Sequence, residues 1–178
     1  MDFWPMQRAY AMLELENFVS NVAFLEGKGF IRIRERDLNG ELKNYWVVQD
    51  KFESPRHIIC IKEIVGYLKE FTEDIATYRT TMPDIVFSCN RIKYAIEVET
   101  GTIIKDKPKI KNKISLLNER FGKNWFFFVT NRNLEKIYSK LGETATKRNI
   151  KFKIRQIFKN SKNRPNLPLR NQDSNREH

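Results

Sequence analysis

The sequence predicts an α/β fold on three observations. Apolar residues recur at helical spacing in two long stretches, residues 55–70 and 108–121. Short stretches rich in β-branched and aromatic residues lie around them, and residues 125–130 are almost uniformly apolar, as in a strand buried on both faces. Hydrophobic residues make up 40% of the 178 residues, enough to predict a globular domain with a proper core.

The N-terminal part is predicted to be a helix followed by a β-hairpin. Residues 8–26 place apolar side chains at helical spacing, and two β-prone runs follow at 30–34 and 42–48. Asn39-Gly40 lies between these runs, and both residue types tolerate a positive φ, which favours a hairpin turn.

The hairpin is basic, because its first strand carries Arg32, Arg34 and Arg36. One interpretation is the wing of a winged-helix module whose arginines contact phosphates. The other is a simple extension of the main fold, since only one helix fits upstream.

The main unit is predicted to begin with a helix at Ser54-Pro55, where Ser supplies the N-cap and Pro the first turn. Further elements are expected in chain order as strands at 73–80, 84–89 and 92–100, a helix at 108–121, a strand at 125–130, a helix at 133–141 and an edge strand at 151–158. We therefore expect an extension over 1–53, a core over 54–158 and a flexible basic tail over 159–178.

The charge balance favours a partner that carries dense negative charge. Lys and Arg number 33 against 22 Asp and Glu, a formal net charge of +11, which suits nucleic acid or an anionic membrane surface. A genome composition that enriches Lys, Asn and Ile is the alternative explanation. The sequence shows no apolar run of membrane-spanning length, no secretory leader and no paired cysteine spacing, so we expect an intracellular, cytoplasmic protein without a membrane partner.

Three acidic residues form the most informative pattern. Asp84 follows Met82-Pro83, and Glu97 and Glu99 lie two apart in the next predicted strand. Side chains alternate between the faces of a strand, so both glutamates point the same way, about 7 Å apart along the strand. Asp84 can join them if the two strands pair as neighbours.

Converging carboxylates repel one another and raise their own pKa values unless a cation neutralises them. Oxygen ligands suit a hard ion such as Mg²⁺ or Mn²⁺, which can activate water for phosphodiester hydrolysis. The alternative is that Glu97 and Glu99 lie on a solvated strand face and have no chemical role.

Pro-Asp on the second strand and Glu-x-Glu on the third, within the order helix, three strands, helix, strand, resemble the PD-(D/E)XK nuclease superfamily over about residues 55–130. The resemblance implies a restriction-endonuclease-like core, similar to that of Holliday-junction resolvases. It implies that Asp84 and Glu97 bind the metal. The third motif position, usually Lys, is Glu99 here, as in some family members, so Glu99 is a candidate general base or further metal ligand.

Other residues are candidates around this site. Lys113 lies close enough to the apolar stripe of its helix to reach back towards the sheet and replace the motif Lys. The family often adds an acidic residue from its first helix, for which Glu63 is the candidate, whereas His57 is expected to be structural. Four further lysines are predicted to bind nucleic acid or to form a solvated face: Lys105, Lys107, Lys109 and Lys111.

The sequence thus predicts a Mg²⁺-dependent DNA endonuclease, expected to act as a homodimer on branched, mobile-element or viral DNA. The alternative is a DNA-binding protein of the same fold that no longer cuts. A third hypothesis, an RNA-binding or protein-interaction module, requires Trp4, Tyr45 and Trp46 to be exposed stacking residues.

Overall fold

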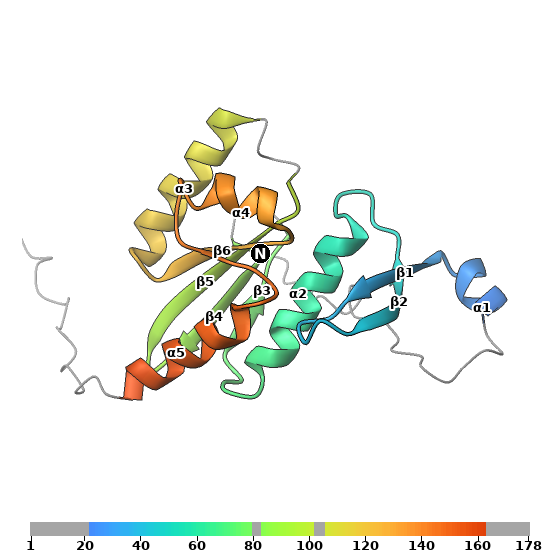
Figure 1. The fold of residues 1–178 in the computed structure, drawn as a ribbon, viewed down its shortest axis with the longest axis horizontal. Helices are drawn as coiled ribbons and strands as arrows, with labels where there is room; N and C mark the ends of the chain where they lie inside the picture. Colours follow the sequence, from blue (N-terminus) through green and yellow to red (C-terminus); the bar gives the residue numbers. More distant parts are fainter. Residues whose placement is uncertain (1–21, 80–82, 102–105, 163–178) are drawn as a thin grey trace, which may run out of the picture.

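The computed structural model describes residues 22–79, 83–101 and 106–162, and within them it shows a mixed α/β protein with five helices and two sheets (Figure 1). In chain order the elements are α1 (Val22–Gly27), β1 (Phe30–Arg36), β2 (Leu42–Val48), α2 (Pro55–Leu68), β3 (Ile75–Thr77), β4 (Ile85–Cys89), β5 (Ile92–Glu99), α3 (Lys107–Phe121), β6 (Trp125–Val129), α4 (Arg132–Tyr138), β7 (Thr144–Ala145) and α5 (Ile150–Lys162). None of the helices in these ranges is both long and apolar enough to cross a bilayer.

The larger sheet has the strand order β3-β4-β5-β6-β7. The first three strands pair antiparallel, whereas β5, β6 and β7 pair parallel. The tight turn between β4 and β5 is at Asn90-Arg91, where φ is 49° and 66°. This turn holds β5 directly beside β4.

Two helical layers cover the two faces of this sheet. On one face, Phe127 of β6 belongs to the apolar cluster that includes residues of α3 and α4. On the other face, Phe126 and Phe128 belong to the cluster that includes residues of α2 and α5. All five side chains of β6 are buried, which confirms a strand covered on both faces.

Two helices of the core, α2 and α3, begin close to the predicted positions. Ser54 caps α2 by accepting a hydrogen bond from the backbone N–H of His57 (3.3 Å), and Pro55 is in the first turn. Asp106 caps α3 in the same way by accepting from the backbone N–H of Lys109 (3.0 Å). Both caps satisfy N–H groups that have no partner inside the helix.

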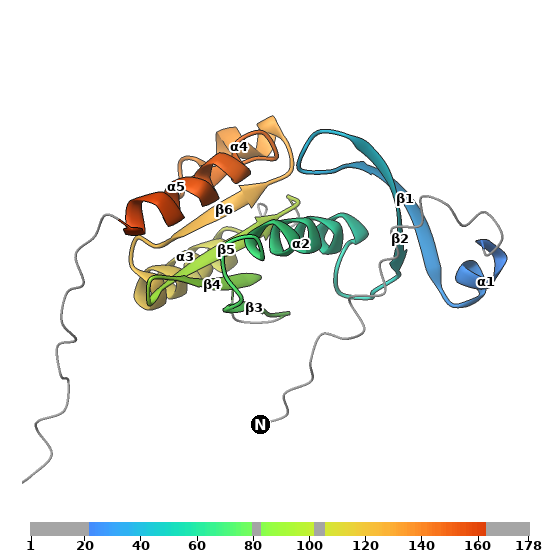
Figure 2. The same ribbon diagram turned by 90° about the horizontal axis from the view of Figure 1, so that it is seen from below.

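The hairpin lies beside α2, on the side away from the larger sheet (Figures 1 and 2). Its inner face packs Tyr45 and Val47 against Ile58 and Ile59 of α2. The predicted hairpin is confirmed, but Asn39-Gly40 is not a two-residue turn. Strand pairing stops before the predicted turn because Asp37 closes a wider loop, in which only Gly40 has a positive φ (86°).

The predicted edge strand at 151–158 is wrong, because these residues form helix α5. Ile150 and Ile154 are buried, and Ile157 and Phe158 pack against the same cluster, which is a helical spacing. Phe152, whose alternation with lysines suggested a strand, is 62% exposed. The helix extends to Lys162, so the first four residues of the predicted tail (159–178) are helical, and the rest lie outside the described residues.

Two other expectations concern residues that lie partly outside the described ranges. Of the helix predicted at 8–26, only the last turns are described, as α1. Tyr45 and Trp46 are buried, which removes them as exposed stacking residues, and Trp4 lies outside the described ranges.

Candidate active site

The three predicted acidic residues come together at one end of β4 and β5. Ile85 pairs with Ile96, so Asp84, which directly precedes β4, lies beside Glu97 and Val98. The backbone N–H of Val98 donates to Asp84 Oδ2 at 2.7 Å. All three carboxylates are buried, so their location is not the solvated strand face of the alternative interpretation.

Glu97 is as enclosed as Glu99, with only 3% of its surface exposed. Its Oε1 contacts the ammonium of Lys113 on α3, while its Oε2 has no hydrogen-bond partner among the described residues. Burial raises the pKa of Glu97 well above its usual value, and the negative charge of Asp84 raises it further against the opposing effect of Lys113.

Glu99 lies on the same face of β5 and has two different partners. Its Oε2 accepts a hydrogen bond from the hydroxyl of Tyr138 on α4 (2.8 Å), and its Oε1 is 3.7 Å from Lys113 Nζ. Burial raises the pKa of Glu99, although the bond from Tyr138 and the charge of Lys113 act in the other direction. Lys113 therefore serves two carboxylates at once.

Asp84 is paired with His57 from the first turn of α2, whose Nε2 lies 3.2 Å from Asp84 Oδ2. Burial lowers the pKa of His57, but the hydrogen bond and charge of Asp84, together with the charges of Glu53 and Glu99, raise it overall. A second carboxylate, Glu53, lies 4.0 Å from His57 Nδ1. His57, expected to be structural, is therefore part of the acidic site.

The oxygen donors of Asp84, Glu97 and Glu99 are the type that a hard divalent ion prefers. The unpartnered Oε2 of Glu97 fits such a ligand, because buried carboxylate oxygens are costly to leave without one. As the side chains lie, no three His, Cys, Asp or Glu residues within the described ranges are arranged to hold a metal ion. Lys113 supplies the positive charge between Glu97 and Glu99 in this arrangement.

The acidic site opens into a cavity of about 440 Å³. All three acids line it, and so do His57 and Lys113. Arg79 and Lys109 line it as well, and so do two further acids, Glu53 and Asp106. Positive and negative side chains therefore meet in this cavity.

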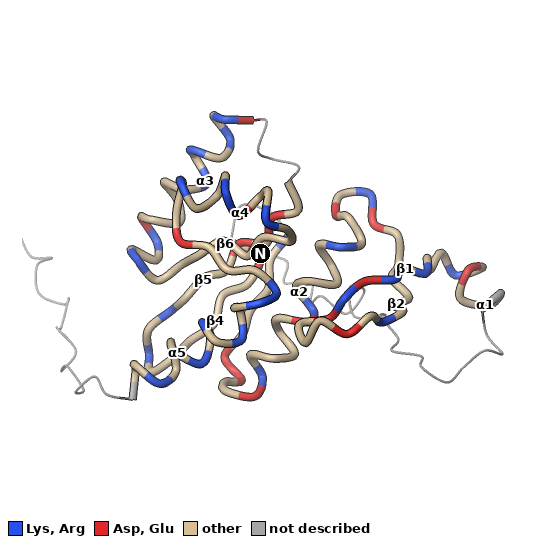
Figure 3. Tube along the Cα trace, in the orientation of Figure 1, with Lys and Arg blue, Asp and Glu red and all other residues tan. Residues whose placement is uncertain are grey.

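The predicted basic residues are only partly brought to this cavity. Lys109 lines it, whereas Lys107 and Lys111 are exposed on other parts of α3, which carries blue segments along its length in Figure 3. Lys105 lies outside the described residues. Arg32 and Arg34 are exposed on β1, and neither lines this cavity.

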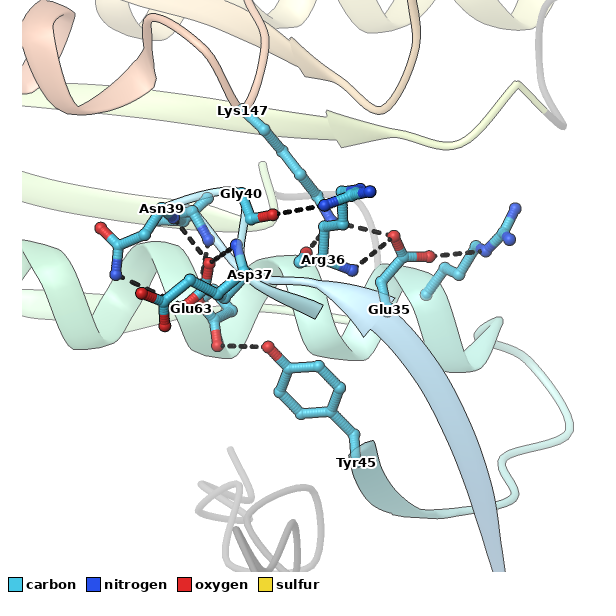
Figure 4. Close-up of polar contacts among 11 residues, drawn as sticks. Glu35, Arg36, Asp37, Asn39, Gly40, Tyr45, Glu63 and Lys147 are labelled. Atoms are coloured by element: carbon cyan, nitrogen blue, oxygen red, sulfur yellow. Dashed lines mark hydrogen bonds and ion pairs between the residues drawn. The ribbon is translucent and has the colours of Figure 1, made fainter. Parts of the chain in front are cut away.

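Glu63 is not at the acidic site, contrary to expectation. Its two oxygens bind the hairpin: Oε2 accepts from the backbone N–H of Leu38 (3.2 Å) and Oε1 accepts from the Tyr45 hydroxyl (2.9 Å), as Figure 4 shows. Asp37 organises the same loop by accepting backbone bonds from Asn39 and Glu41. Glu63 is six residues after His57 in α2, so the two side chains leave the helix on different sides.

Two residues of the site, His57 and Tyr138, had no signal in the sequence that marked them. Each comes from a helix whose own periodicity explains it as an ordinary helical residue, and its partner lies far away in the chain. Only the packing of α2 and α4 at this end of the sheet brings them to Asp84 and Glu99.

No protein-family model matches this chain, and neither a curated protein nor a solved structure matches it significantly.

Proposed function

We propose that this protein is a metal-dependent deoxyribonuclease that hydrolyses phosphodiester bonds. The observation that carries the proposal is the buried group of Asp84, Glu97 and Glu99 with Lys113 beside it, in a cavity that Arg79 and Lys109 also line. Burying three acids with so few counter-charges costs stability, and groups of this kind cluster at functional sites. The net charge of +11 favours nucleic acid as the substrate.

The order of elements from α2 to β6 supports the same proposal. A helix, three antiparallel strands, a helix and a parallel strand is the arrangement expected of a restriction-endonuclease-like core, with Asp84 and Glu97 at the expected motif positions. Homodimer formation, expected for small nucleases that cut two strands, is part of this proposal and awaits a measurement of mass in solution.

Each residue of the site has its own role in the proposed hydrolysis. Asp84, Glu97 and Glu99 would hold Mg²⁺ or Mn²⁺, which supplies a Lewis acid and lowers the pKa of a bound water. Lys113, in the place of the missing motif lysine, donates to the phosphate and stabilises its growing negative charge. His57 positions Asp84, and Tyr138 positions Glu99, which is the candidate for accepting a proton from the attacking water.

The test is cleavage of labelled linear, nicked and four-way-junction DNA with Mg²⁺ or Mn²⁺, compared with EDTA. The decisive variants are Asp84→Asn and Glu97→Gln, which keep the shape of each side chain and remove its charge. Glu119→Gln, an exposed position on α3, is the matched control. We expect metal-dependent cutting that both site variants reduce by about a hundred-fold or more and that the control retains.

A second candidate is a DNA-binding protein that no longer cuts, which is favoured by Glu99 at the position where the motif has lysine. DNA binding without cleavage under any metal would support it and reject the nuclease. In that case, removing the acidic charges would leave binding unchanged or stronger, because it would remove repulsion from phosphates.

A further inference from the structure

A second cavity of about 460 Å³ opens directly beside the acidic site, on the α3 side. It shares Glu97 and Lys113 with the cavity described above, and Arg79 and Lys109 also line both. A strand of DNA whose phosphate lies at the carboxylates would therefore have one of its neighbouring groups at this second opening.

The walls of this second cavity combine apolar surface with positive charge. Pro83, Leu117 and Phe121 contribute apolar surface, and Leu116 adds a side chain that is 39% exposed on an otherwise polar face of α3. Lys109 and Arg120 supply cations, and Asn112 supplies an amide that can both donate and accept hydrogen bonds. A flat aromatic group with polar edges, attached to a phosphate, matches this combination, and a nucleotide base is such a group.

An aromatic side chain also lines the neighbouring cavity, the one that contains the carboxylates. Phe52, in the loop before α2, lines the catalytic cavity and is 93% exposed. The loop is held in place because Asp50 accepts backbone bonds from Phe52 (2.7 Å) and Glu53 (3.2 Å) and pairs with Arg79 (3.3 Å). An exposed ring on a braced loop is a platform for stacking an unpaired base.

We infer that the substrate strand enters this site with unpaired bases, one of which occupies the cavity lined by Leu116 and Phe121. The inference rests on the proposed nuclease function and names its substrate class. A base in an intact duplex must first lose its stacking and its base pair, which costs free energy. A base in a single strand, a flap or a junction arm becomes available at little cost. The protein should therefore prefer DNA that is unpaired at the site it contacts.

Binding in EDTA tests the inference without requiring cleavage. Fluorescence anisotropy at one fixed salt concentration compares single-stranded, flap and duplex DNA, with 2-aminopurine in the unpaired strand as a direct reporter of base stacking. Leu116→Glu places a charge in the cavity. Leu141→Glu is the matched control, because Leu141 lies after α4, is 37% exposed and undergoes the same change of charge. Phe52→Ala, at a fully exposed position, adds a variant that leaves the fold intact.

We expect the unmodified protein to bind unpaired DNA about ten-fold more tightly than duplex, and Leu116→Glu and Phe52→Ala each to remove most of that preference. Leu141→Glu should change it less than about two-fold. Equal binding of all DNA forms, an unchanged 2-aminopurine signal, or equal effects of the two glutamate variants would overturn the inference, even if duplex is cut. A preference that depends on Leu116 without any cleavage would sustain the inference and reject the nuclease.

Discussion

Replacing Lys113 with methionine should destabilise the protein in a way that depends strongly on pH. The ammonium of Lys113 contacts Glu97 and lies 3.7 Å from Glu99, and both acids are buried. Methionine keeps most of the length of the side chain and removes its charge. The substitution therefore leaves two neighbouring carboxylates without their shared cation.

The size of the expected loss of stability follows from how deeply the ion pair of Lys113 and Glu97 is buried. Removing one partner of a fully buried ion pair costs about 3–5 kcal/mol. The side chain of Lys113 is 29% exposed, so water replaces part of the lost interaction, and we expect about 2–3 kcal/mol at pH 8. Lys111→Met, at an exposed position on the same helix, should cost less than about 0.5 kcal/mol.

The pH dependence follows from Glu97, whose pKa in the folded protein is already raised by burial. A carboxyl with a raised pKa binds a proton more readily when folded than when unfolded, so it lowers stability as pH rises above its unfolded value. Without Lys113 this pKa rises further. The loss of stability should therefore be largest at pH 8 and should shrink towards pH 5, because protonation of Glu97 in the fold becomes more favourable as the pH falls.

Urea denaturation at both pH values measures this directly. The double variant Glu97→Gln/Lys113→Met removes both charges and should recover more than half of the loss at pH 8. Mg²⁺ should also stabilise Lys113→Met more than the unmodified protein, since an ion can take the place of the ammonium. An equal loss at pH 5 and pH 8, or a loss no greater than that of Lys111→Met, would refute the proposed coupling between Lys113 and the acids.

Two further predictions test the structure away from the site. Glu63→Ala should lower the free energy of unfolding by about 1–3 kcal/mol in urea denaturation, because the Leu38 amide and the Tyr45 hydroxyl lose their acceptor. DNA cleavage per folded molecule should not change. A loss of cleavage would show that Glu63 acts at the acidic site after all. Burial raises the pKa of Cys60 to about 11, so a thiol reagent at pH 8 should modify it at least about a hundred-fold more slowly than in the urea-unfolded chain. Rapid modification of the native protein would contradict its location in the core.

The misassigned segment at 151–158 illustrates why local pattern was insufficient. Lys151-Phe152-Lys153-Ile154 alternates as a strand does, and over four residues this pattern cannot be distinguished from a helix by period alone. Extending the comparison to Ile150 and Phe158 shows a helical stripe. The sheet face that this stripe covers is built from residues far away in the chain. The burial that decides between a helix and a strand therefore could not be predicted from residues 151–158 alone.

Local pattern in the sequence was enough to predict the elements with strong period, the capped start of α2, the buried strand β6, and the common face of Glu97 and Glu99. Each of these features depends on residues of about one helix or strand. Within one such element, backbone geometry alone sets the direction of a side chain. Tertiary structure alone decided the partners of the acids. It brought His57 to Asp84, Lys113 to Glu97 and Tyr138 to Glu99, and it turned Glu63 towards the hairpin, because these contacts depend on which helix packs on which face of the sheet.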